Sequence, residues 1–226
     1  MNIDMTGHTL LITGGHGGIG RAICECFSSC GAEVIAPSSR DMNLLNEAAI
    51  DSFLDTMTSQ PDMVIHCAGV NELAGIEELA PEVLGKVFRV NLFSFMHILK
   101  CTVPYMRTHH YGRIIGISSL YGIVSRERRI PYSSSKHAMN GLIKSLALET
   151  AGDNVLVNAV APGYVMTEMT RKNLSPQEIE DIRQNIPTGR LQEAEEIAEL
   201  CCFLCSDMNQ SITGQVIPVD GGFTCR

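Results

Sequence analysis

The sequence predicts an α/β fold in which one doubly wound parallel sheet carries helices on both faces. Two observations lead to this prediction. Short apolar segments alternate with helical patterns along the whole chain, and a glycine-rich loop joins the first apolar segment to the first helix. No linker, repeat or low-complexity tract interrupts the 226 residues. Residues 1–226 are therefore expected to form a single domain that is long enough to bury a core.

The first strand is expected at Thr9–Thr13, directly before the glycine loop at 14–20. Apolar side chains then recur at helical spacing from Ile19 to Cys30, and Gly31 is placed to cap that helix. Strand, glycine loop and helix in this order predict a dinucleotide site. The glycines let the backbone approach a pyrophosphate, and the start of the helix offers free N–H groups.

A second expected strand at 32–36 leads into Ser38, Ser39 and Arg40. Sites specific for NAD usually place an acidic residue here, which binds the ribose 2′-hydroxyl. An arginine suits a 2′-phosphate instead, because its guanidinium can bind phosphate through two N–H groups. NADP(H) is therefore favoured over NAD(H) as the cofactor.

The remaining elements follow from the same patterns. Ser175, Pro176 and Glu178 form a capping box that starts a helix, and Pro104 is expected to break or kink a long helix. The expected strands are 62–69, 113–118, 155–160 and 214–219, and the other expected helices are 47–57, 81–109, 132–151 and 193–205.

Tyr132 and Lys136 lie four residues apart at the start of the helix that follows Pro131. Residues with this spacing share one helix face. The ammonium group of Lys136 is therefore expected to approach the phenol and to lower its pKa from about 10 toward neutrality. Such a tyrosine can donate or accept a proton at neutral pH. The spacing is common on helices, so the pair indicates catalysis only together with other residues.

Several of these segments are expected to meet at one edge of the sheet. The glycine loop, residues 38–40, Gly69, Ser119 and the turn at 162–163 each follow a strand. Ligands bind at the carboxyl ends of parallel strands. Tyr132 opens the helix that follows Ser119, so it is expected at the same edge, and these residues are expected to line one crevice.

With these residues in place, the chain resembles the short-chain dehydrogenase/reductase family over nearly its whole length. The residues that carry the resemblance are Thr13, Gly14, Gly18, Ile19, Gly20, Ala68, Gly69, Asn91, Ser119, Tyr132, Lys136, Pro162, Gly163, Val219, Asp220, Gly221 and Gly222. Each is weak alone, but their order and spacing together are specific. The resemblance implies a Rossmann-like sheet of about seven strands.

The resemblance also implies a reaction, the transfer of a hydride between a nicotinamide and a carbonyl or secondary alcohol. The catalytic tetrad would fall on Asn91, Ser119, Tyr132 and Lys136. Tyr132 would protonate the carbonyl oxygen. Ser118 and Ser119 are both candidates for the serine that hydrogen-bonds that oxygen, and Ser119 is selected because it lies three residues before Gly122. Lys136 would lower the tyrosine pKa and hold the nicotinamide ribose, and Asn91 would anchor a water that links Lys136 to solvent.

The cofactor contacts implied by the family extend along the whole crevice. They would fall on Thr13, Gly14, His16, Gly18, Ile19, Gly20, Ser38, Ser39, Arg40, Asp41, Met42, Cys67, Ala68, Gly69, Tyr132, Lys136, Pro162, Gly163, Val165 and Thr167. Among these, Thr167 would contact the nicotinamide carboxamide.

Two stretches depart from the family pattern. Residues 66–69 read His-Cys-Ala-Gly where Asn-Asn-Ala-Gly is common, a change that affects the adenosine half of the site. The stretch between the second strand and Asp62 is short, and a usual helix is missing. Asp41 and Met42 would then contact the adenine, and Arg40 would lie near the ribose.

Within the family, the chain is most similar to bacterial 3-oxoacyl-[acyl-carrier-protein] reductases. The supporting segments are 162–171, 189–191 and 212–214. Arg171 matches a basic residue that contacts the acidic carrier protein in those enzymes, and Arg126, Arg128 and Arg129 are expected to border the same mouth. A substrate linked to acyl carrier protein is therefore one option.

Other functions fit the same residues. A sugar or secondary-metabolite alcohol dehydrogenase would use the same tetrad on another small-molecule carbonyl or alcohol. A non-catalytic dinucleotide-binding regulator is also conceivable, although it would not need Tyr132 and Lys136 together. The family implies a homotetramer or homodimer built on the long helices that follow Pro81 and Pro131.

Composition argues against two kinds of partner. The net charge of −8 argues against a nucleic-acid binder, and no apolar run reaches the roughly 18 residues that span a bilayer. The N-terminus lacks the charged segment and cleavage site of a signal peptide, so a cytoplasmic location is expected.

The nine cysteines are expected to be reduced. Their number is odd, and several lie within apolar helical patterns, which favours thiols acting as small core residues. Cys202 and Cys205 have CxxC spacing, but no second pair and no histidine at zinc spacing accompanies them. No metal site is therefore expected.

Overall fold

The computed structural model describes residues 3–167, 170 and 175–225, and its centre is one parallel sheet. The strands lie in the order β2-β1-β3-β4-β5-β6. Their bounds are β1 Thr9–Thr13, β2 Glu33–Ile35, β3 Met63–His66, β4 Gly112–Ile117, β5 Val155–Pro162 and β6 Val216–Val219. The four central strands β1, β3, β4 and β5 are buried along their whole lengths, as expected for a sheet covered on both faces.

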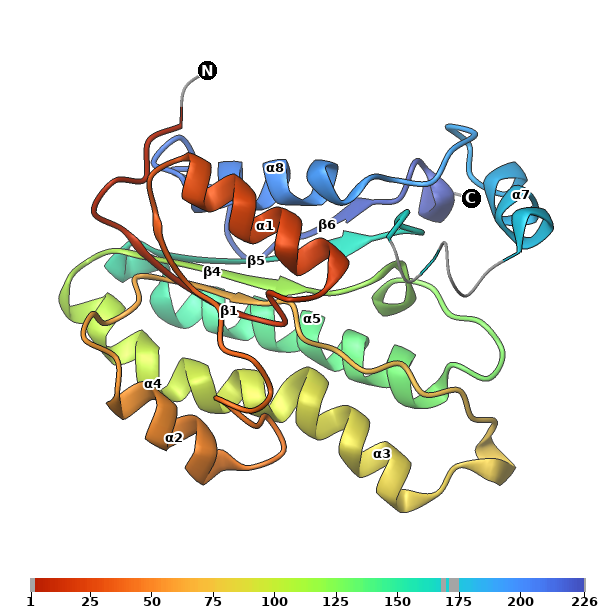
Figure 1. Cartoon of the computed structure of the whole chain (residues 1–226), viewed down its shortest axis with the longest axis horizontal. Coiled ribbons are helices and arrows are strands. Elements are labelled where there is room, and N and C mark those ends of the chain that lie inside the picture. The colour runs from red at the N-terminus through yellow and green to blue at the C-terminus, as the bar shows by residue number, and fades with distance from the viewer. Residues whose placement is uncertain (1–2, 168–169, 171–174, 226) are drawn as a thin grey trace.

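Helices cover both faces of the sheet, as the alternating pattern predicts. In Figure 1, α1 and α8 lie on one face, and α2, α4 and α5 lie on the other. The helices are α1 Gly18–Ser29, α2 Glu47–Asp55, α3 Pro81–Phe88, α4 Ser94–Thr108, α5 Ile130–Thr150, α7 Pro176–Gln184 and α8 Ala194–Cys205. Short 3₁₀ turns occur at Ile76–Glu78, Leu120–Gly122, Ala151–Asp153 and Phe223–Cys225. Within the described ranges, no helix is long and apolar enough to cross a membrane.

The sheet has six strands in the described part of the chain, so the expectation of about seven strands is wrong. Residues 36–46, between β2 and α2, form turns and irregular backbone. A further parallel strand needs a crossover connection of about a dozen residues or more. This segment is too short to hold both that connection and a strand, so β2 forms the edge of the sheet.

The predicted ends of two helices are confirmed. α1 ends in a Schellman turn in which Gly31 has a φ of 90°, and the Ala32 N–H reaches the Phe27 carbonyl at 3.1 Å. α7 begins with the capping box of Ser175 and Glu178, with Pro176 in its first turn. Both ends follow from local backbone chemistry, which the sequence displays directly.

Of the two outcomes expected at Pro104, a break does not occur, because α4 continues through the proline to Thr108. Proline has no N–H, so Pro104 cannot donate a hydrogen bond to the Lys100 carbonyl. Both residues lie at exposed positions, where water can hydrate that carbonyl. The irregularity lies earlier, in a π-helical segment at Arg89–Phe93 that joins α3 to α4 and carries Asn91. π-Helical turns often mark functional positions.

Candidate active site

A crevice opens where the strand order reverses, between β1 and β3. The chain turns from β1 to β2 on one side and later returns to β3 on the other side. Ligands bind outside the carboxyl ends of strands at such a point. Two cavities of about 700 and 370 Å³ lie here, and both are lined by Gly14, Gly17, Cys67 and Gly69. Together they form one elongated site.

The glycine loop fits a dinucleotide because its backbone leaves no room for side chains. Gly14 has a φ of 72°, and a Cβ there would lie 2.6 Å from the Ala68 nitrogen. A Cβ at Gly20 would collide with the Gly14 carbonyl oxygen. No side chain of the described residues caps α1 at Gly17, so the first N–H groups of the helix remain for a ligand. These groups suit a pyrophosphate.

The larger cavity collects most of the residues predicted for the adenosine half of the cofactor. These are Thr13, Gly14, His16, Ser38, Ser39, Met42, Cys67, Ala68 and Gly69. Arg40 and Asp41 are exposed and do not line it. The Asp41 carboxylate accepts hydrogen bonds from the Ser38 hydroxyl at 2.6 Å and the Ser38 N–H at 2.9 Å, which lower its pKa. Asp41 thus holds the turn that presents Ser38 rather than facing the cavity.

Eight residues of this cavity are not among the predicted contacts, namely Gly17, Pro37, Asn43, Leu44, Leu45, Val70, Lys86 and Val90. For residues 43–45, the sequence offered one signal, the short segment after β2. Because no further helix intervenes, this segment places residues 43–45 close to the cavity. Lys86 comes from α3, and its Nζ pairs with Glu72 at 2.8 Å. Contacts of this kind arise from packing and leave no local pattern.

The smaller cavity brings together the predicted catalytic side chains Ser119, Tyr132 and Lys136. The predicted cofactor residues that share it are Gly14, Gly18, Ile19, Gly20, Cys67, Gly69, Pro162, Gly163, Val165 and Thr167. The cavity is also lined by residues outside the predicted contacts, namely Gly17, Asn71, Ile117, Ser118 and Thr170. A group bound along the loop would therefore extend from the start of α1 to Tyr132.

Lys136 is buried beneath Tyr132. Its Nζ donates a hydrogen bond to the Ile117 carbonyl at 2.6 Å and lies 5.7 Å from the centroid of the Tyr132 ring. Burial lowers the pKa of Lys136 to about 8, so the side chain is still largely charged at neutral pH.

The pKa of Tyr132 is raised, which differs from the expected lowering. Burial disfavours the phenolate and outweighs both the hydrogen bond with Ser119 and the positive charge of Arg129, which lower the pKa. Helical spacing alone could not reveal this, because desolvation depends on residues packed around the helix from elsewhere in the chain.

Ser119 and Ser118 have different partners. Ser119 accepts the Tyr121 N–H at 3.1 Å and hydrogen-bonds Tyr132, whereas the Ser118 hydroxyl donates to Asn140 at 2.7 Å. Of the two serines, Ser119 is therefore the one that faces Tyr132. It is also the serine that the spacing to Gly122 favours.

Asn91 lies behind the cavity rather than on its wall. Its side chain is buried, donates to the Val70 carbonyl at 3.1 Å and to Ser135 at 3.0 Å, and accepts the Val70 N–H at 2.8 Å. Gly69 separates it from Lys136, since a Cβ on this glycine would lie 3.5 Å from Asn91 Oδ1 and 3.7 Å from Lys136 Nζ.

His66, noted in the sequence only as a departure, links three parts of the site. Its Nε2 lies 3.0 Å from the Val90 carbonyl, and its Nδ1 lies 2.9 Å from the Thr13 hydroxyl. The carbonyl can only accept, so Nε2 carries the proton and Nδ1 accepts from Thr13. Burial, followed by the charge of Lys136, lowers the pKa of His66 to about 3. The residue thus acts as a neutral bridge to the π-helical segment of Asn91.

Comparisons with known proteins agree with this geometry. The family model described as enoyl-(acyl carrier protein) reductase matches residues 40–224. A 3-oxoacyl-[acyl-carrier-protein] reductase of Aquifex aeolicus is 33% identical, with 98% of this chain and 99% of that protein covered. A tropinone reductase homolog of Arabidopsis thaliana is also 33% identical, with 98% and 94% covered.

A solved structure extends the likeness to three dimensions. It is described as a putative NAD(P) dependent gluconate 5-dehydrogenase from Beutenbergia cavernae with bound NADP. It has a TM-score of 0.91 and 30% identity, and the alignment covers 100% of both chains. The crevice, the sequence and these relatives together show that the chain belongs to the short-chain dehydrogenase/reductase family and is an NAD(P)-dependent oxidoreductase.

Proposed function

We propose that the protein interconverts a ketone and a secondary alcohol, with NADP(H) as cofactor. The observation that carries this proposal is the shared cavity, in which Ser119, Tyr132 and Lys136 face the start of α1. When bound, the nicotinamide would supply or accept a hydride. The glycine loop would hold the pyrophosphate, and Lys136 would lie within reach of the nicotinamide ribose.

The three side chains would divide the proton chemistry. The raised pKa keeps Tyr132 protonated at neutral pH, which suits a proton donor to the carbonyl oxygen in the reductive direction. The Ser119 hydroxyl would donate a hydrogen bond to the same oxygen. The charge on Lys136 would stabilise the phenolate once the proton has left, and Asn91, behind Gly69, would order the path between Lys136 and solvent.

A third cavity, of about 630 Å³, supports a substrate that extends away from Tyr132. Tyr121, Tyr164, Arg126 and Arg129 line it. The two tyrosine hydroxyls lie 2.8 Å apart, and Arg129 Cζ lies 5.1 Å from the centroid of the Tyr121 ring. The carboxylates Glu178 and Asp181 share this wall, and the two arginines offer the groups that would bind an acidic or phosphate part of a substrate.

Two residues expected at this mouth do not contribute to its described wall. Arg128 forms an ion pair with Glu78 at 2.7 Å and does not line the cavity. Arg171 lies outside the described residues. A 3-oxoacyl thioester on an acidic carrier protein is the substrate we favour, since Arg126 and Arg129 remain at the mouth.

A ketone panel tests the reaction and the substrate class together. The purified protein would be mixed with NADPH and a 3-oxoacyl thioester on carrier protein, a bicyclic amino ketone or a keto derivative of gluconate. We expect loss of NADPH absorbance with at least one ketone, and fastest with the carrier-linked thioester. Absence of turnover with every ketone, and with the matching alcohols and NADP⁺, would contradict the proposed reaction.

Arg40 is proposed to favour the 2′-phosphate, because it follows Ser38 and Ser39, which line the adenosine cavity. Its backbone N–H donates to Ser38 at 3.2 Å, and its guanidinium forms no ion pair within the described ranges. An Arg40→Ala change is expected to reduce the preference for NADPH over NADH by about tenfold, the worth of one charge-assisted hydrogen bond. Kinetics with both cofactors measure this ratio.

Arg183→Ala is the matched control, because this arginine lies on α7 and pairs with Glu180 at 2.8 Å. It is expected to leave the ratio unchanged. An unaltered ratio in Arg40→Ala would instead assign the selection to other residues of the cavity, such as Lys86, and Lys86→Met would then test that assignment.

We also propose that the protein associates as a homotetramer or homodimer through α4 and α5. Phe93, the last residue of the π-helical segment, is 45% exposed, Met96 at the start of α4 is 46% exposed, and Leu148 on α5 is 87% exposed. Large apolar side chains on the outer faces of neighbouring helices are typical of interfaces. Sedimentation of the purified protein is expected to give an oligomer, and a monomer at micromolar concentration would contradict this proposal.

A cytoplasmic location is part of the same proposal. All nine cysteines are free, which suits a reducing compartment. Fractionation of the host cell would test it, with the protein expected in the fraction that holds cytoplasmic enzymes.

A further inference from the structure

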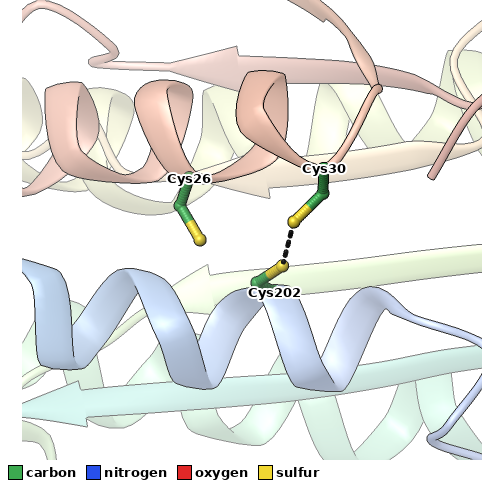
Figure 2. Close-up of side chains that lie close together, drawn as sticks. All are labelled: Cys26, Cys30 and Cys202. Carbon is green, nitrogen blue, oxygen red and sulfur yellow. Dashed lines mark hydrogen bonds between the residues drawn. The ribbon is translucent and has the colours of Figure 1, made fainter. Parts of the chain in front are cut away.

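Three cysteines converge where α1 packs against α8, on the face of the sheet away from α4 and α5. Cys26 lies in the last turn-and-a-half of α1, Cys30 is the residue that caps the end of this helix, and Cys202 faces them from α8 (Figure 2). The sulfur atoms of Cys30 and Cys202 are 3.5 Å apart, and all three sulfurs lie within 4.8 Å of one another. The CxxC spacing in the sequence suggested Cys205 as the neighbour of Cys202, but Cys205 is not in this cluster.

The surroundings of the cluster suit a cation. The thiols of Cys30 and Cys202 share a hydrogen bond, and Cys26 lines a cavity of about 270 Å³ with Glu195 and Glu199. Glu199 lies three residues before Cys202 on α8 and shares the wall of this cavity with Cys26. The site therefore offers three sulfur donors, a nearby carboxylate and an opening to the surface.

We propose that Cys26, Cys30 and Cys202 bind one Zn²⁺ ion, with Glu199 or a solvent molecule as the fourth ligand. Zinc prefers four ligands and accepts a mixture of sulfur and oxygen. Zn–S bonds of about 2.3 Å in a tetrahedral site place sulfurs about 3.8 Å apart. The cluster lies close to this spacing, so small side-chain rotations suffice.

Binding requires no oxidant or reductant. As each Zn–S bond forms, the thiol loses its proton to solvent, and zinc keeps its charge. Because Cys30 and Cys202 are 172 positions apart in the sequence, the ion would cross-link the first helix to the last long one. The site uses none of the residues assigned to the reaction, so it stands or fails independently of the proposed function.

Cobalt titration of the reduced, metal-free protein tests this site directly. The full chain would be kept reduced with a phosphine and titrated with Co²⁺, which gives a thiolate-to-metal charge-transfer absorption at sulfur-rich sites. We expect one Co²⁺ per chain, displacement by Zn²⁺, and a higher melting temperature with Zn²⁺. Cys26→Ser and Cys202→Ser are expected to weaken Co²⁺ binding by about tenfold or more.

Two further variants make the assignment specific. Cys225→Ser removes an exposed thiol outside the cluster and is expected to bind Co²⁺ like the wild type. His97→Asn disrupts the other group of candidate ligands, Asp51, His97 and Cys101, and is likewise expected to leave the absorption unchanged. Because Cys202 is buried, circular dichroism must show that its variant folds, and the half-buried Cys26 provides a second variant less prone to misfolding.

Three outcomes would overturn the proposal. The first is a reduced protein that shows no charge-transfer absorption with Co²⁺. The second is an absorption that persists in folded Cys26→Ser and Cys202→Ser, or that disappears only in His97→Asn. The third is a cluster that forms a Cys30–Cys202 disulfide under mild oxidation but binds neither Co²⁺ nor Zn²⁺ when reduced.

Discussion

Tyr132→Phe is expected to lower kcat for ketone reduction by about 10²- to 10⁴-fold, the range for loss of a positioned general acid. The change removes one oxygen from a side chain that lines the cavity together with Ser119 and Lys136. Phenylalanine keeps the ring, so the fold and the glycine loop should be unaffected. NADPH binding is therefore expected to change little, and the loss should appear in kcat.

Steady-state kinetics with the best ketone, together with a fluorescence titration of NADPH, separate these effects. Tyr105→Phe is the matched control, because this tyrosine lies on α4 and lines neither cavity of the crevice. It is expected to turn over like the wild type. Equal turnover by Tyr132→Phe would remove the tyrosine from the mechanism and leave the cavity without its proposed proton donor.

The second large effect is a loss of stability in acid that depends on His66. The pKa of this residue is about 3 in the folded protein and 6.5 in an ordinary environment. Below pH 6.5 the unfolded chain therefore binds a proton that the folded chain does not. The stabilising contribution is complete above pH 6.5 and is lost as the pH falls toward 3, by up to about 5 kcal/mol.

The comparison of wild type with His66→Asn isolates this contribution. Asparagine places its amide where the imidazole has Nδ1, so its Oδ1 can still accept from the Thr13 hydroxyl, it loses the bond of Nε2 to the Val90 carbonyl, and it cannot titrate. Urea unfolding at several pH values between 7.5 and 4 should show the wild type losing stability more steeply, by up to about 1.4 kcal/mol per pH unit. His137→Asn, on the exposed side of α5, serves as the control. Parallel pH profiles of the free energy of unfolding for wild type and His66→Asn would show that His66 is not held neutral in the folded protein.

Much of the site could be predicted because its signals are local. A positive φ at Gly14 and the missing side chains at Gly18 and Gly20 are requirements of a short loop, and the sequence displays them as glycines. The preference for Ser119 over Ser118 rested on the spacing to Gly122. In the structure, a Cβ at Gly122 would lie 2.7 Å from Ser118 Oγ, so the close approach of that turn accounts for the glycine.

Positions that depend on distant segments could not be predicted. Arg40 and Asp41 follow β2 as expected, but both are exposed and neither lines the adenosine cavity. Arg128 is close in sequence to Arg126 and Arg129, which line the third cavity. It forms an ion pair with Glu78 from another segment instead. In the described part of the chain the sheet has six strands. Residues 36–46, which follow β2, are too few to hold both a crossover connection and a further strand.

The sequence alone determined the order of strands and helices, the glycine loop and the helical spacing of Tyr132 and Lys136, because each depends on neighbours within a few residues. The direction of the Tyr132 pKa shift, the neutral state of His66 and the meeting of Cys202 with Cys26 and Cys30 were decided by the tertiary structure. Desolvation and side-chain contact depend on which segments pack together, and that packing brings residues far apart in the chain within a few ångströms.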